Sequence, residues 1–530
     1  MTALDIADLA AGFGRTEVVH GISLRIEAGE CVALVGESGS GKSVAARALL
    51  GLTQRDGWVR ARRLDIDGHD ARAWSQRRWR RIRGGTVGYV TQHALGSLDP
   101  LRRIGQEVRE TLQVHRRVPR TDLDDAAEQL LERVGVPDAA QRLRQYPHEL
   151  SGGLRQRALI ATVLAAAPRF LVADEPTTAL DPSVQRRIIA LLSEIRDAGT
   201  GLLLISHDLA TVAEIADRVA LMRDGRIVEH GPTAEVLTRP RHEYTRTLLA
   251  AVPSAHTRGT RLSAAEFDLA TQLPARQVSA ATGALVRVRE ARRTFRRPDA
   301  SVTAALDGVD LSVGPGRIVG VVGESGCGKT TLARVLLGLE ALDSGSVSVA
   351  PGADVQAIFQ DALGSFDPRF TVRRVLDEAI EAGGVRRGER TAQARRLLAA
   401  VGLPDSVLPR RPLELSGGQQ QRVAIARALA PGPDLIVCDE PVSALDVSVQ
   451  AQILDLLLQV REKLGVALVF ISHDLGVVRH LSDEVIVMCA GKIVESGPTE
   501  ELFTHPTAPY TRELLAAVPA LPIPTLTEHR

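Results

Sequence analysis

Cysteine is scarce in this sequence, and long apolar runs are missing. Four cysteines occur among the 530 residues, without the close paired spacing that is typical of metal sites. We therefore expect a reducing, cytoplasmic environment. No uncharged apolar run approaches the ~20 residues that a transmembrane helix requires, and the first residues do not resemble a signal peptide. These absences predict a protein that is soluble by itself.

A strong excess of either charge is also missing. The chain has 65 Lys and Arg against 64 Asp and Glu, which gives a net charge of +1. Proteins that bind nucleic acid or anionic membranes usually carry a marked basic excess, so we predict no nucleic-acid partner. Lysine occurs only at Lys42, Lys329, Lys463 and Lys492, so arginine supplies almost all the positive charge. We interpret this as the codon usage of a GC-rich genome.

The sequence does contain a repeat that spans half its length. "VGESGSGKS" recurs as "VGESGCGKT", "LSGGLRQR" as "LSGGQQQR", "VADEPTTALD" as "VCDEPVSALD", and "LISHDL" as "FISHDL", in the same order. A chain of this length exceeds what one hydrophobic core normally organises. We therefore predict a tandem duplication, with one domain over 1–253, a linker over 254–283 and a second domain over 284–530.

The two copies differ in length ahead of a shared glutamine. Their separation falls from 287 residues at Lys42 and Lys329 to 268 at Gln92 and Gln360, so the second copy is 19 residues shorter there. The first copy has in this interval the arginine-rich run "RRWRRIR" at 77–83. We interpret this run as a solvated helix face, with a nucleic-acid patch as the alternative.

Short apolar runs separated by helix-like segments indicate the fold class. "CVALVG", "RFLVAD" and "GLLLIS" are typical of strands that are buried on both faces of a parallel sheet. We therefore expect each copy to form an α/β layered domain.

Both copies carry a complete G-x-x-x-x-G-K-[S/T] loop after an apolar run, at 36–43 and 323–330. Such a loop wraps a polyphosphate with backbone N–H groups at the start of a helix. Lys42 and Lys329 are expected to neutralise the β- and γ-phosphates, and Ser43 and Thr330 to ligate Mg²⁺. The residues predicted to form the two phosphate-binding loops are Gly36, Ser38, Gly39, Gly41, Lys42 and Ser43, and Gly323, Ser325, Gly326, Gly328, Lys329 and Thr330.

Two carboxylates end an apolar run in each copy, a costly placement unless a cation or water needs them. Asp174 and Asp439 fit a Mg²⁺ site held through water. Glu175 and Glu440, one residue further on, are predicted to orient and deprotonate the attacking water.

A histidine follows the next apolar run of each copy, at His207 and His473. We predict that both contact the γ-phosphate, with a structural role as the alternative.

These motifs together resemble the ATP-binding cassette (ABC) family over essentially the whole chain. The resemblance implies two P-loop cassettes, each with a mainly parallel core sheet, a small antiparallel β subdomain and a helical subdomain. It implies that the "LSGG" motif of each cassette binds the γ-phosphate held by the other, in a cassette dimer within one chain. The motif residues are Ser151, Gly152 and Gly153, and Ser416, Gly417, Gly418 and Gln419; Leu154 stands where the second copy has Gln419.

The same resemblance implies roles for two further pairs. Gln92 and Gln360 match the loop glutamine that contacts ATP and Mg²⁺ in this family. Phe13 and Phe295 stand where family members often stack an aromatic ring on adenine, with core packing as the alternative.

A repeated tail narrows the group. "HEYTRTLLAAVP" at 242–253 and "APYTRELLAAVP" at 508–519 closely resemble the tail of ATPase subunits of oligopeptide, dipeptide and nickel importers. This implies an ATPase that drives peptide uptake with two membrane permease subunits and an extracytoplasmic binding protein, at the cytoplasmic face of the inner membrane. Nickel, glutathione or opines are the alternative cargoes. Many relatives hold an iron–sulfur cluster after this tail, but 254–284 and 520–530 contain no cysteine, so we predict none.

The rival class is the soluble twin-cassette ATPase that acts on ribosomes. Such proteins typically have a long, charged, helical linker and a lysine-rich surface. Here the linker is weakly patterned and lysine is rare. The resemblance therefore favours the importer.

Overall fold

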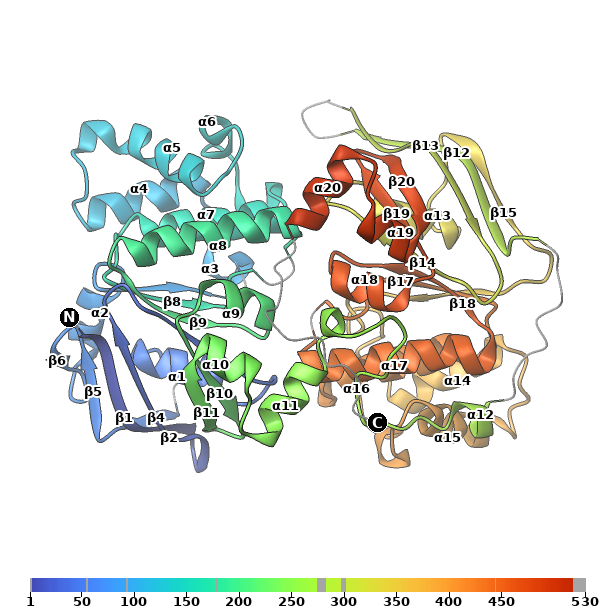
Figure 1. Cartoon of the computed structure of the whole chain (residues 1–530), viewed down its shortest axis with the longest axis horizontal. Helices are drawn as coiled ribbons and strands as arrows, with labels where there is room; N and C mark the ends of the chain where they lie inside the picture. Colours follow the sequence, from blue (N-terminus) through green and yellow to red (C-terminus); the bar gives the residue numbers. More distant parts are fainter. Residues whose placement is uncertain are drawn as a thin grey trace. The chain divides into compact units, whose positions relative to one another are not determined.

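The structure is a computed structural model that describes residues 2–53, 56–91, 94–177, 180–273, 283–296, 302–443 and 445–517. The described chain divides into a first unit that ends at Leu249 and a second unit that begins at Ala250 (Figure 1). Each unit contains one copy of the repeat.

A mainly parallel sheet forms the centre of the first unit. The order across the sheet is β11 (Arg226–Pro232), β10 (Arg218–Arg223), β3 (Cys31–Val35), β9 (Gly201–Ile205), β8 (Phe170–Asp174) and β7 (Val87–Val90). The predicted apolar runs become β3, β8 and β9, and every residue of these strands is buried. Among the described strands of this sheet, all neighbours are parallel except β10 and β11.

The second unit has the same kind of central sheet. The order is β16 (Val355–Ile358), β17 (Leu435–Asp439), β18 (Ala467–Ile471), β14 (Ile318–Val322), β19 (Glu484–Cys489) and β20 (Lys492–Pro498). Its only antiparallel pair, among the strands that the structure describes, is β19 with β20.

A smaller antiparallel sheet accompanies each central sheet. In the first unit it comprises β2 (Thr16–Glu27), β1 (Thr2–Phe13), β5 (Arg63–Ile66) and β6 (His69–Asp70), with β4 (Gly57–Arg60) also paired to β1. In the second unit it comprises β13 (Val302–Val313), β12 (Val286–Arg296) and β15 (Ser344–Val349).

The extra residues of the first copy form β6 and a short helix, α2 (Gln76–Ile82). Trp79 of this helix is buried, whereas its arginines are exposed. The run therefore forms an exposed helix face as predicted, except for Arg83, which follows the helix and is half-buried.

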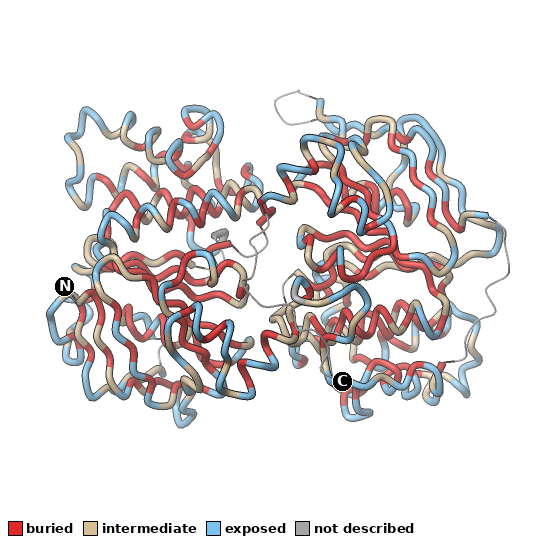
Figure 2. Tube along the Cα trace, in the orientation of Figure 1, coloured by how far each residue is buried: buried red, intermediate tan, exposed pale blue. Residues whose placement is uncertain are grey.

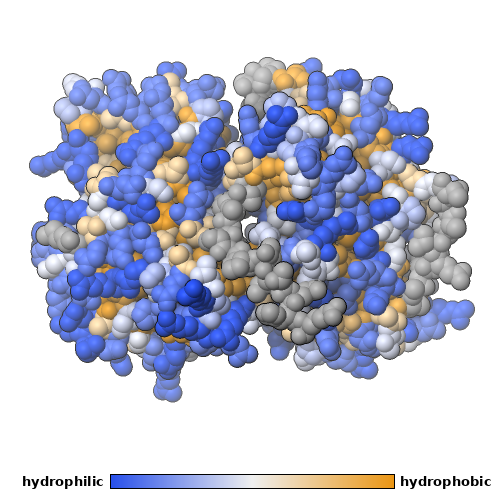
Figure 3. Space-filling view, in the orientation of Figure 1, coloured by the Kyte–Doolittle hydropathy of each residue, from blue (hydrophilic) through white to orange (hydrophobic). Residues whose placement is uncertain are grey.

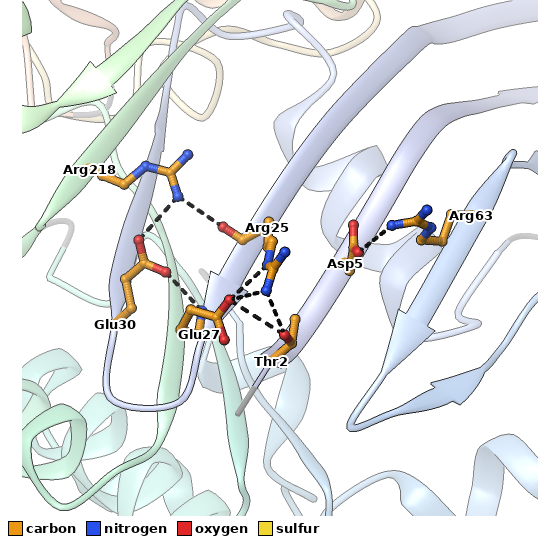
Figure 4. Close-up of polar contacts among 7 residues, drawn as sticks. All are labelled: Thr2, Asp5, Arg25, Glu27, Glu30, Arg63 and Arg218. Carbon is orange, nitrogen blue, oxygen red and sulfur yellow. Dashed lines mark hydrogen bonds and ion pairs between the residues drawn. The ribbon is translucent and has the colours of Figure 1, made fainter.

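Polar contacts connect the antiparallel and central sheets of the first unit (Figure 4). The Arg218 guanidinium at the start of β10 donates to the Glu30 carboxylate at 3.1 Å and to the Arg25 carbonyl of β2 at 3.2 Å. Arg63 pairs with Asp5 across β5 and β1 at 2.7 Å. Such partly exposed pairs are worth only ~0–1 kcal/mol each, so burial of the apolar faces of both sheets supplies most of the stability.

Helices complete the layers. In the first unit, α4 (Ile104–Val114), α5 (Leu123–Arg133) and α6 (Ala139–Arg142) lie on the side of the central sheet away from β1 and β2 (Figure 1). In the second unit, α14 (Val372–Ala382) and α15 (Arg390–Ala400) lie away from β12 and β13 (Figure 1). Figure 2 shows the buried central strands between more exposed helices, and Figure 3 shows that hydrophilic residues dominate the face in view. The predicted fold class is confirmed.

The described part of the predicted linker packs on the second unit. Leu262, Leu269 and Leu273 are at most 6% exposed and belong to the apolar core of this unit. Leu269 lies in the short helix α12 (Leu269–Gln272), which contacts α15 and α17 (Val447–Leu464). Asp455 of α17, 1% exposed, accepts hydrogen bonds from Leu262 N at 3.0 Å and from Ser263 N at 2.8 Å. The segment 254–273 is therefore part of the fold of the second unit.

No helix in the described ranges is long and apolar enough to span a bilayer.

Candidate nucleotide-binding sites

Each glycine-rich loop leads from a central strand into a helix. The loop 36–43 joins β3 to α1 (Lys42–Leu49), and the loop 323–330 joins β14 to α13 (Lys329–Leu336). Gly41 and Gly328 precede the helices with φ of 100° and 109°, a left-handed conformation that favours glycine. A Cβ on Gly36 would lie 2.1 Å from the Met222 carbonyl oxygen, so this position has no room for a side chain.

The loop lysines are buried inside their loops. Lys42 Nζ donates to the Gly36 and Glu37 carbonyls at 2.6 and 2.7 Å. Lys329 Nζ donates to the Gly323 and Glu324 carbonyls at 2.7 and 2.8 Å. The tips of both loops are exposed, at Ser38 and Gly39 and at Ser325 and Gly326. The geometry suits a phosphate chain lying against the loop amides and the lysine.

Hydroxyl and carboxylate oxygens meet beside each loop. Ser43 Oγ donates to Asp174 Oδ1 at 3.4 Å, and the Tyr89 hydroxyl donates to Asp174 Oδ2 at 3.1 Å. Asp174 is 3% exposed, and burial raises its pKa. Burial also raises the pKa of Asp439, against a hydrogen bond from Thr330 that lowers it. These oxygen donors fit Mg²⁺, which would stabilise the buried charge.

The structure describes one of the two loop glutamines. Gln360 Nε2 donates to Glu440 Oε2 at 2.9 Å, so the predicted ligand lies beside the predicted general base. Gln92 lies outside the described residues.

The predicted general bases are each paired with the predicted histidine. His207 Nδ1 lies 3.3 Å from Glu175 Oε1, and His473 Nδ1 lies 3.4 Å from Glu440 Oε2. Burial lowers the pKa of both histidines, but the hydrogen bond and the charge of the glutamate outweigh it, so the net shift is upward. The sequence placed these residues near one site and did not predict their pairing.

The two glutamates also have unusual backbones. Glu175 has φ of 49° and Glu440 has φ of 48°. This left-handed conformation costs a non-glycine residue roughly 1–2 kcal/mol. Such strain often marks functional positions, where the surrounding structure maintains it.

The "LSGG" motifs begin helices. Ser151 is the N-cap of α7 (Gly152–Leu164), and Ser416 is the N-cap of α16 (Gly417–Leu429); both serines are exposed. Gly152 and Gly417, the first helical residues, are exposed, while Gly153 and Gly418 are half-buried. Gln419 Oε1 also accepts from Ser416 N at 3.1 Å, which Leu154 cannot do. An exposed helix N-terminus suits an incoming phosphate.

The predicted adenine-stacking residues lie at the ends of β1 and β12. Phe13 is half-buried beside Trp58 and Arg47. Phe295 is 38% exposed, with the Arg293 guanidinium 4.9 Å from its ring centroid. Phe295 is therefore not a core residue, and stacking on adenine stays a prediction for both rings.

Three tyrosines near these sites were not predicted. Tyr89 contacts Asp174, as described above. Tyr244 and Tyr510, both in the repeated tail, contact the glycine-rich loops: each hydroxyl accepts a hydrogen bond, from Glu37 N at 3.0 Å and from Glu324 N at 3.1 Å. The recurrence of "YTR" in both copies was the available signal.

Comparisons with known proteins identify the family. A family model described as ABC transporter matches residues 19–178 and 306–443. A second, described as Oligopeptide/dipeptide transporter, C-terminal region, matches residues 228–273 and 494–529. The chain belongs to the ABC transporter family, and its cassettes hydrolyse ATP.

Two relatives match over nearly the whole chain. The oligopeptide transport ATP-binding protein OppD of Mycobacterium tuberculosis is 39% identical, over 97% of this chain and 98% of the relative. The glutathione import ATP-binding protein GsiA of Pectobacterium atrosepticum is 39% identical, over 95% of this chain and 87% of the relative.

A solved complex of an archaeal ribosomal stalk protein with the ribosome recycling factor aABCE1 matches with a TM-score of 0.61. The sequence identity is 19%, over 93% of this chain and 90% of the solved one. At this identity the likeness shows the fold alone, so it does not favour the ribosomal alternative.

Proposed function

We propose that this chain couples ATP hydrolysis in its two cassettes to the uptake of peptides through two partner permeases. The observation that carries the proposal is the pairing of two ABC transporter cassettes with a tail that, in both copies, matches the oligopeptide/dipeptide transporter model. Glutathione is the alternative cargo, because the relatives include glutathione import ATPases.

The chemistry assigns a role to each side chain of the site. Glu175 and Glu440 accept a proton from the attacking water. His207 and His473 hold these carboxylates in place and contact the γ-phosphate. Mg²⁺, when bound with ATP, would neutralise phosphate charge at an oxygen site that Ser43, Asp174, Thr330 and Asp439 supply.

Both cassettes lie on one chain, so one chain serves one transporter through an intramolecular cassette dimer. Tethering raises the effective concentration of each cassette for the other to roughly the millimolar range. The permeases hold the chain at the cytoplasmic face of the inner membrane, where an extracytoplasmic binding protein delivers cargo from the other side.

A groove on the second unit suits a short cytoplasmic helix of a permease. It has a volume of about 380 Å³ and is lined among others by Phe366, Phe370, Ala379 and Arg427. The mixture of aromatic and apolar walls with an arginine fits an amphipathic helix.

Cross-linking to the permease tests this contact. Leu98 and Phe366 occupy equivalent positions in the two copies, but their side chains are only 3% and 6% exposed. Leu101 is 84% exposed, and Arg369, its counterpart in the second copy, is also exposed. Cysteines at Leu101 and Arg369 should therefore cross-link to cysteines on the permease loop.

Transport in proteoliposomes tests the function. The chain would be reconstituted with a candidate permease pair and binding protein, and the uptake of peptide, glutathione and nickel would be compared. ATP-dependent peptide uptake is expected, with loss in Lys42→Ala and Lys329→Ala. Copurification of ribosomes in place of permeases would overturn the proposal.

A further inference from the structure

The repeated tail reaches the glycine-rich loop in each unit. Tyr244 lies in α11 (Glu243–Ala250), and Tyr510 lies in α20 (Pro509–Ala516). Their hydroxyls accept the N–H groups of Glu37 and Glu324, which are the second residues of the two loops. The bonded residues are 207 and 186 positions apart, so each contact is tertiary.

In each unit, the tyrosine and the loop lysine bind the same loop residue, the tyrosine at its backbone N–H and the lysine at its carbonyl oxygen. In the first unit, the Glu37 N–H donates to Tyr244, and the Glu37 carbonyl accepts from Lys42. The Glu324 backbone is held in the same way by Tyr510 and Lys329. A phosphate that draws the lysine away would remove one of these contacts. The tyrosine would then keep the first turn of the loop in place.

A strand glutamate binds the start of each tail helix and so fixes the position of its tyrosine. In the first unit, the Glu229 carboxylate of β11 accepts from Arg241 N at 2.8 Å and from His242 N at 3.0 Å, and it also contacts Thr245. Thr245 is fully buried, and Tyr244 is 4% exposed.

The second unit repeats this anchor. The Glu495 carboxylate of β20 accepts from Thr507 N at 2.7 Å and from Ala508 N at 3.1 Å. Burial raises the pKa of Glu495, but hydrogen bonds from Thr507 and Ala508 outweigh it, and the pKa is lowered to about 2. A glutamate that accepts two backbone N–H groups ahead of the tail helix therefore occurs in both copies.

We propose that Tyr244 and Tyr510 are positioning residues of the two ATP sites, through which the importer-type tail fixes the conformation of the glycine-rich loop. The inference rests on the proposed ATP-binding role of these loops. Neither tyrosine touches the reacting atoms, so the effect falls on nucleotide affinity and only weakly on the chemical step.

Nucleotide titration of the full-length chain tests the inference one site at a time. In a Lys329→Ala background the first site is read alone, and Tyr244→Phe should raise its Kd for ATP roughly three- to tenfold, the effect of one lost hydrogen bond. Tyr510→Phe in the same background should leave that Kd unchanged. Thr247→Ala, which removes an exposed hydroxyl from the same helix, is the second control.

Amide hydrogen exchange gives a readout that does not depend on activity. Without nucleotide, Tyr244→Phe should speed exchange in the peptide that contains 36–43, while exchange in 323–330 and the melting temperature stay close to wild type. Unchanged affinity together with unchanged exchange would overturn the inference. Failure of the Lys329→Ala parent to bind ATP would instead overturn the proposed ATP site.

Discussion

The predicted catalytic glutamates and histidines have the same geometry in both cassettes. Each cassette pairs a glutamate in a left-handed backbone with a histidine, at 3.3 Å in the first and 3.4 Å in the second. The visible asymmetry is Leu154, which stands where the other motif has Gln419. Ser151, Gly152 and Gly153 retain the backbone groups expected to touch phosphate.

We therefore expect both sites to hydrolyse ATP. Glu175→Gln and Glu440→Gln should each lower transport-coupled hydrolysis at least tenfold, because each removes a general base; tenfold corresponds to about 1.4 kcal/mol. Steady-state hydrolysis in the reconstituted transporter is the measurement. Nearly wild-type activity in Glu440→Gln beside a dead Glu175→Gln would mean that the second loop only holds nucleotide.

At the level of elements, a missing side-chain cap distinguishes the two motif helices. In α16, Ser416 Oγ accepts from Gln419 N at 3.4 Å, while the Gln419 side chain accepts from Ser416 N, so both polar groups are satisfied. In α7, only the first of these bonds is present, from Leu154 N to Ser151 Oγ. The reciprocal cap was predictable from the sequence once the motif was placed at a helix start.

Leu154→Gln should restore the second bond and stabilise the first unit by about 0.5–1 kcal/mol. Thermal unfolding without nucleotide would show a higher melting temperature. Gln419→Leu is the matched reverse change and should lower it. Equal melting temperatures for Leu154→Gln and wild type would show that the cap adds nothing.

The anchor of α20 gives a pH-dependent prediction. The pKa of Glu495 is lowered to about 2 from 4.5, so its stabilising effect is complete above pH 4.5 and disappears as the pH falls toward 2. Glu495→Gln should therefore lower the melting temperature by a constant amount between pH 7 and 4.5, and by less at lower pH. Glu501→Gln, at an exposed position of α19 (Thr499–Thr504), is the control. A deficit that grows below pH 4.5 would contradict the assignment.

At the scale of the whole molecule, the main feature is how the segment 254–273 packs. It continues from the first unit along the chain, yet its leucines lie in the core of the second and Asp455 accepts its backbone N–H groups. The packing of residues 254–273 on the second unit therefore does not depend on an intact chain through 274–282.

We expect the two fragments of the chain to stay associated after proteolytic cleavage within 274–282. A protease site inserted within 274–282 of the full chain, cleaved after folding in EDTA without nucleotide, should leave both fragments co-eluting in gel filtration. Leu269→Asp should separate them, because it places a carboxylate at a fully buried position. Ala270→Asp, an exposed neighbour in α12, should not. Separation of the wild-type fragments would refute the expectation.

The sequence by itself determined the α/β class, the duplication, and the loops, acids and histidines of the two sites. These features are local: burial on both faces shows as apolar runs, and loop and cap geometry requires particular residues at fixed spacing. The added residues of the first copy were also visible as a change in repeat separation.

Only the tertiary structure decided which partners these residues meet. The bond from Glu37 N to Tyr244 spans 207 residues, and that from Leu262 N to Asp455 spans 193. No local pattern encodes such pairings, because they depend on how the strands are ordered in the sheet and on which helix faces remain to be covered. For this reason the duplicated tail was recognisable from sequence as a group marker, while its contact with the ATP loop became visible only in the folded chain.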